Sequence, residues 1–590
     1  MKKALKILLL IITVLSAIIY AYFIYPVWGF TFYENHNLKV PLTPAWALEC
    51  WLWEDDVNTA EYVNELLEGY KKYDIPVRTI LIDSPWSLRY NDFEIDTNRY
   101  PNPQKWFKKL EDDGYRTVLW MTPVVNSYSK DTQIQDSRDW FNSANEKGYL
   151  IKNKNENNWW KGNGKFIDYT NDEAVKWWRS LQQNIFDFGI DGWKLDGAAT
   201  LLWSEILGIP MFYNSSSEGT ITTRNYMDLY YRQEYKYGLE MNPEFVTLSR
   251  SVDGFYTHPE GFSPLDASPV NWVGDQKHTW KSESDSENED NQDLVMDGIE
   301  GIETAIQYIL KSAELGYNII GSDIAGFSGR IIPPRLYIRW TQFSTFCGLF
   351  LNGGHGERRL WKRSSEELEI IRKFSWLHTE LIPYMYHYVV SANREGKTLQ
   401  KPLNIGKYQY MFGDNLLVAP IYEDSKIREV VLPEGKWRYF FNDSDLLEGD
   451  QKIIKEFPLD EYTVFIKEGA IIPMNIERNY TNIGDSTFGD YLTILIYPQE
   501  SNNFTYHNPE NYKDSTEISY SKNSDEIKIN FKGKSLTHIL KIYSLQKPNE
   551  ILLDNNKLNE NIDWNYKSEV NKIIIRTSNY EQGNYHITFN

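Results

Sequence analysis

The sequence predicts an α/β fold, a (β/α)8 TIM barrel, preceded by a transmembrane helix and followed by two C-terminal all-β sandwich domains. Three observations support this fold class. An apolar run begins the chain, helix-like and strand-like segments alternate over residues 31–395, and short strands separated by turn residues follow over residues 396–590. Strands that alternate with amphipathic helices form parallel sheets, and eight such units close into a barrel.

The N-terminal segment, residues 1–30, has the composition of a signal anchor. Lys2, Lys3 and Lys6 precede an uncharged apolar run over residues 7–25, which is near the length needed to cross a hydrocarbon core. The run is longer than the apolar region of most signal peptides, and no small-residue cleavage site stands out. Because lysines stay on the cytoplasmic side, we expect a single-pass protein whose remaining chain is extracytoplasmic. The alternative is cleavage of a long signal, which would release a secreted protein.

Residues 31–395 contain the predicted barrel, in which segments of helical period alternate with short apolar strands. Successive helix and strand pairs are expected at 55–73 and 78–82, at 103–114 and 116–121, and at 171–188 and 190–195. We expect a helix over residues 377–392 to end the barrel.

Two long insertions are expected on the rim of the barrel, at residues 198–243 and 281–296. The first carries Trp203, Phe212 and several tyrosines. Within the second, residues 281–291 read KSESDSENEDN, which lacks the glycine and the ligand spacing of an EF-hand loop. We therefore interpret the acidic run as a solvated loop and predict no metal site.

After the barrel the periodicity changes to that of short strands. Ile527, Ile529 and Phe531 alternate with polar residues, as side chains do on a half-buried strand. We expect two β domains, one over residues 396–475 and a second over residues 476–590.

Composition narrows the class of ligand. The formal net charge of −20 would repel the phosphates of a nucleic acid, whereas a neutral sugar is unaffected by it. Aromatic residues make up 15% of the chain, and flat rings suit the C–H faces of sugars. Only Cys50 and Cys347 are present, each in an apolar run, so no disulfide framework is indicated.

Two carboxylates directly follow apolar strands. Asp196 is followed by the final glycine of the run IDGWKLDG at residues 190–197, and Asp275 follows SPVNWVG at residues 268–274. Barrels of this kind keep their chemistry at the C-terminal ends of the strands. Cleavage of a glycosidic bond needs one carboxylate that attacks the anomeric carbon and another that protonates the leaving oxygen. The pair therefore indicates a glycosidase.

Many short segments, in order along the chain, resemble those of glycoside hydrolase family 31, whose members are retaining enzymes acting on α-linked sugars. The segments lie at residues 44–48, 81–86, 91–93, 99–103, 118–123, 168–178, 248–251, 321–327 and 355–356, and in the first β domain at 408–421, 432–437 and 464–473. The resemblance covers roughly residues 43–475, and so many ordered matches are more specific than any single motif.

The resemblance implies that Asp196 is the nucleophile and that Asp275 is first the acid and then the base, at the separation of about 5 to 5.5 Å that retaining enzymes use. Lys194 lies two residues before Asp196, so its side chain leaves the same face of the strand and its charge favours the ionised nucleophile. Trp272 contributes the apolar surroundings that favour a protonated Asp275.

The resemblance also implies a set of residues that bind the sugar. Asp83, Arg250, Asp323 and His355 match family positions that hydrogen-bond the sugar in the cleaved subsite or support residues that do, and Trp120 would line the same pocket.

The sequence departs from the family pattern in features that bear on specificity. Many members have a glutamate three residues after the nucleophile, where this chain has Ala199, and an arginine expected before Asp275 is replaced by residues 257–264. Few residues separate the anchor from the barrel, where typical members carry a β-sandwich. Because a lost acceptor can change discrimination by orders of magnitude, we expect plain α-glucosides such as maltose to be poor substrates, and galactose or a substituted sugar to be preferred.

The expected function is that of an exo-acting, retaining α-glycoside hydrolase that needs no cofactor or metal and acts on a neutral oligosaccharide or glycoconjugate. An α-transglycosylase or a lyase on the same scaffold is an open alternative, because these reactions differ only in what resolves the intermediate. A catalytically weak carbohydrate-binding protein is a further alternative. The sequence does not indicate an oligomeric state.

Overall fold

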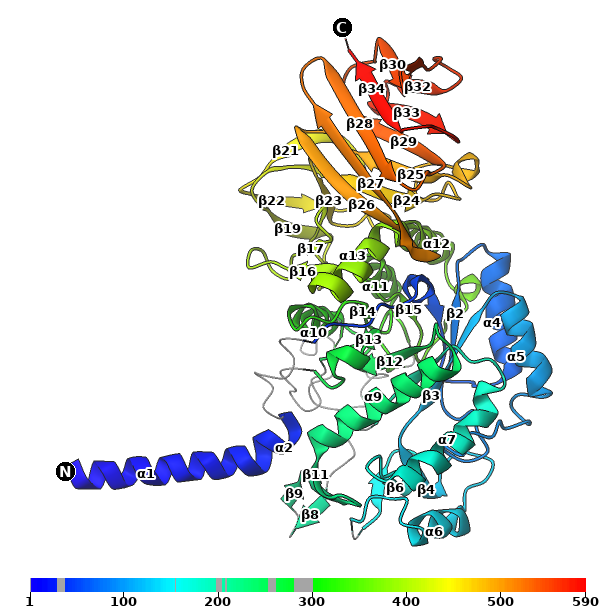
Figure 1. Ribbon diagram of the computed structural model, residues 1–590, viewed down its shortest axis with the longest axis vertical. Coiled ribbons are helices and arrows are strands. Elements are labelled where there is room, and N and C mark those ends of the chain that lie inside the picture. The colour runs from blue at the N-terminus through cyan, green and yellow to red at the C-terminus, as the bar shows by residue number, and fades with distance from the viewer. Residues whose placement is uncertain are drawn as a thin grey trace. The chain divides into compact units, whose positions relative to one another are not determined.

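The computed structural model describes residues 2–28, 38–153, 155–197, 204–206, 209–252, 261–280, 301–329 and 331–589 (Figure 1). The expected rim insertion at 281–296, Ala199, Trp203 and residues 257–260 of the replaced arginine segment lie outside the described residues. The chain divides into two compact units. The first comprises Met1–Pro41, Leu52–Leu66 and Arg78–Gly274, and the second comprises Leu42–Trp51, Leu67–Val77 and Asp275–Asn590.

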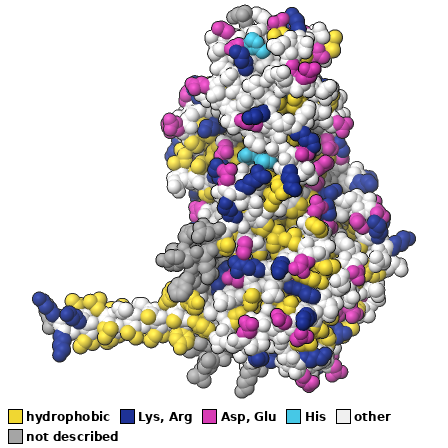
Figure 2. Space-filling model, in the orientation of Figure 1, with side chains coloured by type: hydrophobic (Ala, Val, Ile, Leu, Met, Phe, Trp, Pro, Cys, Tyr) yellow, Lys and Arg dark blue, Asp and Glu magenta, His cyan; other side chains and the backbone are white. Residues whose placement is uncertain are grey.

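The N-terminal segment is helical throughout its described length. It consists of α1 (Lys2–Ile19), a π-helical turn η1 (Tyr20–Ile24) and α2 (Tyr25–Trp28). Over Lys2–Ile24 the mean hydropathy reaches 2.7 and no part of the helix is buried. Figure 2 shows apolar side chains along this helix and basic side chains at its tip. By length and composition it is able to cross a membrane.

Eight short strands form one sheet, the nearly closed barrel, in the order β14-β13-β12-β7-β3-β2-β1-β15. The strands are β1 (Trp51–Leu52), β2 (Thr79–Ile82), β3 (Arg116–Met121), β7 (Gly192–Leu195), β12 (Val246–Arg250), β13 (Val270–Trp272), β14 (Ile320–Gly321) and β15 (Leu351–Asn352). Neighbours from β2 to β13 pair in parallel. All of their residues except Arg116 are buried, as expected for strands covered on both faces.

Helices follow these strands and cover the sheet (Figure 1). They are α4 (Ala60–Lys72), α5 (Pro103–Asp112), α7 (Asp172–Phe186), α9 (Thr223–Met241), α10 (Ile302–Glu314), α11 (Pro334–Thr345), α12 (Ser365–Glu380) and α13 (Ile382–Glu395). A short helix α6 (Arg138–Glu146) and the strands β4 (Val124–Ser129), β5 (Asn157–Trp159) and β6 (Gly162–Phe166) lie between β3 and α7. Two hairpins, β8 (Ser204–Ile206) with β9 (Ile209–Met211) and β10 (Tyr213–Ser216) with β11 (Gly219–Thr222), lie between β7 and α9.

The barrel units agree with the expected periodicity, with two corrections. The helix expected over residues 377–392 is divided at Leu381, where α12 ends and α13 begins. Strand β3 spans the expected residues 116–121, and α7 begins at Asp172 because the side chain of Asn171 accepts hydrogen bonds from the first turn. Residues 223–241, expected to lie in a long rim loop, instead form helix α9. The buried face of α9 contains tyrosines and Glu234, which are polar or amphipathic residues that a hydropathy pattern does not register as core.

Glu234 joins α9 to α7 through a buried hydrogen-bond network. Its Oε2 accepts bonds from Arg179 Nη1 at 2.6 Å and Gln182 Nε2 at 2.7 Å. Its Oε1 accepts bonds from Tyr169 Oη at 2.5 Å and Trp178 Nε1 at 3.1 Å. The carboxylate is fully buried, so its charge depends on these partners and not on water for stabilisation.

The C-terminal part of the chain is built mainly of sheets. A six-stranded sheet contains β16 (Gln400–Pro402), β17 (Tyr410–Phe412), β18 (Leu416–Val418), β23 (Val464–Lys467), β20 (Lys436–Tyr439) and β21 (Asn442–Glu448), in that order, and β19 (Ile427–Leu432) pairs with β22 (Gln451–Glu456). Side chains from both sheets, among them Leu417, Val430, Trp437 and Phe465, share one apolar core.

Two further sheets complete the chain. The five-stranded sheet contains β24 (Ile471–Asn475), β25 (Leu492–Ile496), β29 (His538–Tyr543), β33 (Lys572–Thr577) and β32 (Trp564–Lys567), in that order. The six-stranded sheet contains β26 (Ser501–Asn508), β27 (Asn511–Lys522), β28 (Glu526–Gly533), β34 (Asn584–Thr588), β30 (Glu550–Leu553) and β31 (Asn556–Lys557). Strand β24 pairs with β25, so residues 471–475 join these later sheets. Ile527, Ile529 and Phe531 are buried in alternation, as expected.

We predict that Glu234→Ala lowers the free energy of unfolding by about 3–5 kcal/mol, because it leaves the partly buried Arg179 without its carboxylate. The measurement is thermal unfolding followed by circular dichroism. Glu240→Ala, on the exposed side of the same helix, is the matched control and should change the midpoint little. Equal midpoints for the two variants would show that the network does not stabilise the helix pair.

Candidate active site

Asp196 lies at the C-terminal end of β7 in the first unit. Its backbone N–H donates to Met121 O at 3.0 Å, which continues the pairing of β7 with β3 by one residue. The next residue, Gly197, has a φ of 78°, a left-handed conformation that glycine adopts without a steric penalty. The chain therefore turns away directly after the carboxylate, which is only 7% exposed.

The two oxygens of the Asp196 carboxylate have different partners. Oδ1 accepts hydrogen bonds from Arg250 Nε at 3.1 Å and from the Gly197 backbone N–H at 2.8 Å. Oδ2 accepts one from Trp120 Nε1 at 3.2 Å. Among the residues that the structure describes, Oδ2 is thus the oxygen with fewer donors, and it retains more of its lone-pair capacity.

The surroundings of Asp196 favour its charged form. Burial by itself raises the pKa of this carboxyl, but the positive charges of Arg250 and Lys194 and the hydrogen bonds from Trp120 and Arg250 outweigh it, so the pKa lies below its ordinary value. An ionised carboxylate meets one requirement of a nucleophile, because the charged form is the one that attacks.

Lys194 is held between a carboxylate and two indole rings. Its Nζ donates to Asp83 Oδ2 at 2.8 Å, and both side chains are buried. The same Nζ lies 4.0 Å from the ring centroid of Trp53 and 5.4 Å from that of Trp272. The other oxygen of Asp83 accepts the backbone N–H of Ser84 at 2.7 Å. These contacts hold the ammonium group in place, near enough to Asp196 for its charge to lower the pKa of that carboxyl.

Arg250 and Trp272 complete the cluster. Strands β12 and β13 pair in register at these two residues, and the guanidinium carbon of Arg250 lies 4.8 Å from the Trp272 ring centroid. Two carboxylates, Asp83 and Asp196, thus face two cations, Lys194 and Arg250. We call these four residues the charge tetrad. Its formal charges cancel, which is a condition for burying so many ionised groups.

Aromatic rings extend toward the surface from Trp120 on β3, whose indole donates to Asp196. The Trp120 and Trp159 rings stack with centroids 6.4 Å apart, and Tyr90 contacts both edge-on. Trp86 Nε1 donates to Trp120 O at 2.7 Å and fixes the backbone of that residue. The array ends at Trp160, whose side chain is 47% exposed.

Asp275, Asp323 and His355 belong to the second unit. Asp275 is half-buried, and Asp323 is 1% exposed. The backbone joins their loops: Phe327 N donates to Gln276 O at 2.7 Å, and His355 N donates to Phe327 O at 2.9 Å. The rings of Phe327 and His355 are in contact, with centroids 4.8 Å apart.

Arg358 joins the loops that carry Asp323 and His355. It is fully buried and donates to Ile324 O, Gly326 O and His355 O at 2.5, 2.8 and 3.0 Å. Gly326 has a φ of 90°, and a Cβ there would come within 2.6 Å of Lys277 O. Only glycine allows this loop to approach so closely.

His278 completes the support of the same loop. Its Nδ1 lies 2.7 Å from Ala325 O. Burial, aided by the charge of Arg358, lowers the pKa of His278 to about 3, so the imidazole is neutral and acts here as a structural hydrogen-bonding group.

The sequence reasoning did not identify Trp53, Trp86, Arg358 or Tyr230. Tyr230 Oη donates to Asp196 O at 3.3 Å, and it comes from α9, which was expected to be a loop. Trp53 directly follows strand β1, and its place at the end of a barrel strand was a usable signal. Arg358 lies three residues after His355, with no feature of the sequence to indicate that it is buried. Among the described residues, no group of three or more His, Cys, Asp or Glu is arranged to hold a metal ion.

Comparison with known families and proteins agrees with the observed fold. A model of the glycosyl hydrolases family 31 TIM-barrel domain matches residues 40–388, and one of the family's C-terminal domain matches residues 383–472. An α-xylosidase of Emericella nidulans is 26% identical over 467 residues, which are 74% of this chain and 54% of that protein. An isomaltosyltransferase of Sporosarcina globispora is 24% identical over 523 residues, 79% of this chain and 44% of that protein. The chain spans about half the length of these curated relatives.

Solved structures show the same fold. The family 31 dextranase of Flavobacterium johnsoniae, complexed with glucose, superposes with a TM-score of 0.78 at 24% identity, over 94% of this chain and 71% of that one. The two family models confirm the resemblance found in the sequence. Because the two family models together match residues 40–472, well over half of the chain, the protein belongs to glycosyl hydrolase family 31, whose α-xylosidases and α-glucosidases are O-glycosyl hydrolases.

Proposed function

We propose that this protein is a retaining, exo-acting α-glycoside hydrolase that removes terminal α-linked sugars from oligosaccharides or glycoconjugates. The observation that carries the proposal is the buried Asp196 carboxylate, whose pKa is depressed by Arg250 and Lys194 despite its burial. Retaining hydrolysis needs an ionised nucleophile, and enzymes of this barrel fold carry their catalytic groups at the C-terminal ends of the strands. No bound metal or organic cofactor takes part in the proposed reaction.

In the first step, one oxygen of Asp196 attacks the anomeric carbon while Asp275 protonates the leaving glycosidic oxygen. Oδ2 is the attacking atom in this proposal, since Oδ1 already accepts two N–H bonds. In the second step, Asp275 removes a proton from water, and the water oxygen displaces Asp196. The two inversions together retain the α configuration.

The remaining site residues divide into two roles in this proposal. Lys194 is a member of the charge tetrad, and the Trp272 ring lies against both of its cations. Both residues are proposed to position and stabilise the other charges of the tetrad. Asp83, Arg250, Asp323 and His355 are proposed to bind or support the hydroxyls of the sugar, with Trp120 beside it. The exposed Trp160 ring extends this aromatic surface toward the remainder of the substrate.

Transfer to a sugar acceptor instead of water is the second candidate function. It is favoured by the likeness to an isomaltosyltransferase. The covalent step would be unchanged, and the acceptor would replace water in the second step. The preference for galactose or a substituted sugar over plain α-glucosides stays a prediction, and the expected residue for it, Ala199, lies outside the described residues.

We further propose that the N-terminal helix is an uncleaved anchor with its lysines in the cytoplasm. Lys2, Lys3 and Lys6 all precede the apolar run, and the positive-inside rule assigns this end to the cytoplasm. The catalytic residues would then act on extracytoplasmic glycans.

We predict that Asp196→Ala and Asp275→Ala each lower turnover of an α-linked oligosaccharide by about two to four orders of magnitude or more. Azide rescue with an activated aryl α-glycoside separates the two roles. Asp275→Ala should give the α-glycosyl azide, because azide attacks the covalent intermediate, and Asp196→Ala should give the β-glycosyl azide, because azide replaces the nucleophile. The products are identified by NMR.

The matched control for both variants is Asp187→Ala, which removes an exposed carboxylate shortly before the same strand. It should retain full activity. Near-normal turnover by either site variant would refute its assigned role, and the same azide anomer from both variants would refute the division of roles.

We predict that Arg250→Met shifts the acid limb of the kcat/KM profile to higher pH. Arg250 lowers the pKa of Asp196, so its removal raises that pKa, and Asp196 then loses its charge at a higher pH as the solution is acidified. Arg232→Met, which removes a partly exposed arginine paired with Asp266, should leave the limb in place. An unchanged limb in Arg250→Met would contradict the electrostatic role, whatever the loss in rate.

We predict that the full chain sediments with membranes and resists carbonate and high-salt extraction, and that a chain lacking residues 1–30 remains in the supernatant. The measurement is immunoblotting of the fractions together with N-terminal sequencing of the native protein. A native N-terminus near residue 25 would instead establish a cleaved signal.

A further inference from the structure

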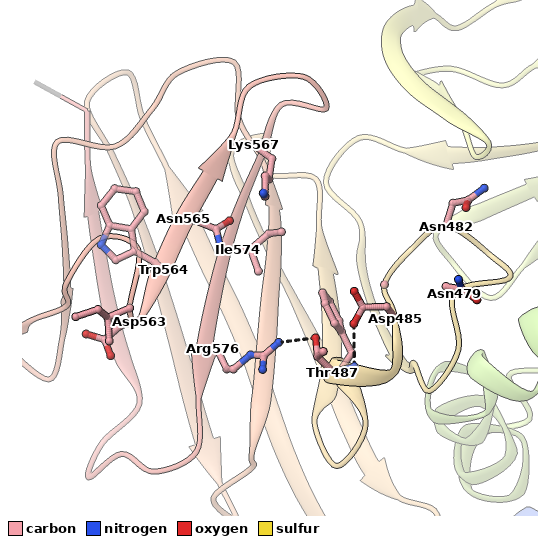
Figure 3. Close-up of a pocket in the computed structure, with 13 residues that line it drawn as sticks. Asn479, Asn482, Asp485, Thr487, Asp563, Trp564, Asn565, Lys567, Ile574 and Arg576 are labelled. Atoms are coloured by element: carbon pink, nitrogen blue, oxygen red, sulfur yellow. Dashed lines mark hydrogen bonds between the residues drawn. The ribbon is translucent and has the colours of Figure 1, made fainter.

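A groove in the C-terminal sheets has the size of a ligand site. It has a volume of about 710 Å³ and lies between the edge strand β32, its neighbour β33 and the loop at residues 479–488 (Figure 3). Ligand pockets in proteins commonly measure about 300–1,000 Å³. The groove lies wholly within the second unit, and none of the residues implicated in catalysis lines it.

The floor of the groove is a regular part of the sheet. Asn565 on β32 is directly opposite Ile574 on β33, and Lys567 and Arg576 lie two residues further along the same faces, because side chains alternate along a strand. Trp564 lines one end but is 5% exposed, and its ring points away from the centre of the groove in Figure 3. The polar side chains of the floor therefore project from a rigid support.

One hydrogen bond and the ring contacts of Arg576 hold the opposite wall to the sheet, and a second hydrogen bond lies within the wall. Asp485 Oδ1 accepts the backbone N–H of Thr487 at 2.8 Å, and Arg576 Nη2 donates to Thr487 Oγ1 at 3.3 Å (Figure 3). The Arg576 guanidinium carbon also lies 5.1 Å from the ring centroid of Tyr491 and 5.7 Å from that of Phe488. The wall is thus organised before any ligand binds, which lowers the entropic cost of binding.

The chemistry of the lining favours a neutral ligand with many hydroxyl groups. Asp485 and Asp563 balance Lys567 and Arg576 in formal charge, so the groove has no net attraction for a phosphate or another polyanion.

The groove is lined both by hydrogen-bonding groups and by apolar side chains. Asn479, Asn482 and Asn565 present side-chain amides, and Ile562, at 80% exposed, and Ile574 add apolar contacts. The buried Oδ1 of Asn565 accepts no hydrogen bond from any residue that the structure describes. Amides that both donate and accept, next to apolar groups, match the hydroxyl and C–H faces of a sugar.

We propose that this groove is a second carbohydrate site, which binds a segment of a neutral oligosaccharide independently of the catalytic carboxylates. It would retain a polymeric or surface-attached glycan on the protein between cleavage events. Two linked sites on one chain raise the effective concentration of the glycan without a new contact at either site.

The test uses the detergent-solubilised full chain carrying Asp196→Ala, so that no probe is consumed. The probes are dextran, amylose and xyloglucan, and dextran sulfate tests for an anionic ligand, all by affinity electrophoresis. We expect retardation by at least one neutral polymer. Adding Asn565→Ala with Lys567→Ala should weaken the apparent affinity about tenfold or more, because two hydrogen-bonding groups are lost.

A second groove variant and a control variant distinguish a loss of binding from a loss of folding. Asn482 has a φ of 61°, so Asn482→Gly removes the amide without straining the backbone, and it should also weaken binding. Asn530→Ala, on the exposed face of β28, is the matched control and should bind as the parent does. All variants are compared by thermal unfolding.

Equal retardation of the parent and both groove variants would overturn the proposal, as would no retardation by any neutral polymer, or retardation by dextran sulfate alone. Hydrolysis of an aryl α-glycoside is measured separately in chains that retain Asp196. The groove variants should leave this rate unchanged. A loss of all hydrolysis in the parent chain would count against the proposed catalytic function and not against the groove.

Discussion

The charge tetrad, in which the carboxylates of Asp83 and Asp196 meet the cations of Lys194 and Arg250, is the interaction on which the rest of the site depends. All four residues are less than 10% exposed. An isolated ion at such a depth is strongly disfavoured, and loss of one partner from a buried pair costs about 3–5 kcal/mol. The cluster is stable only because each charge has an opposite charge and hydrogen bonds nearby. This same balance leaves Asp196 ionised within an apolar barrel.

The barrel supplies the positions that the tetrad requires. Lys194 and Asp196 are two residues apart on β7, Asp83 directly follows β2, and Arg250 is the last residue of β12. Because parallel strands place their C-terminal ends at one edge of the sheet, residues far apart in sequence meet there. Trp53 and Trp272 cover the cations with their ring faces, which attract positive charge and exclude water. Within the second unit, Asp275, Asp323 and His355 lie on loops that Arg358 and Gly326 hold together.

Much of this arrangement is predictable from sequence because it depends on short-range patterns. The strand at 116–121 and the helix after Asn171 follow from apolar period and capping. The end-of-strand position of Asp196 follows from an apolar run that stops at glycine. Two of its donors, Trp120 and Arg250, were expected near the sugar through the family resemblance. That both donate hydrogen bonds to Asp196 itself is visible only in the structure, because hydrogen-bond partners are set by tertiary packing.

Other features of the structure could not be predicted from the hydrophobic periodicity of the sequence. Helix α9 was expected to be a loop, because its buried face is made of tyrosines and a glutamate whose polar atoms find partners only in the folded state. Arg358 resembles a surface arginine in sequence, yet it is fully buried with its donors on three carbonyl groups. The groove beside β32 forms where two consecutive strands, β32 and β33, meet a loop that is distant from them in sequence. Such features arise from long-range contacts and not from local composition.

The central claim is that Asp196 forms a covalent bond with the sugar, and trapping that bond tests it most directly. The full chain would be incubated with 5-fluoro-α-glycosyl fluorides of several sugars, digested and examined by tandem mass spectrometry. We expect one glycosyl adduct, located on Asp196, whose formation parallels the loss of activity. An adduct on another carboxylate, or steady turnover of an α-glycoside by a chain in which Asp196 is replaced by alanine, would contradict it.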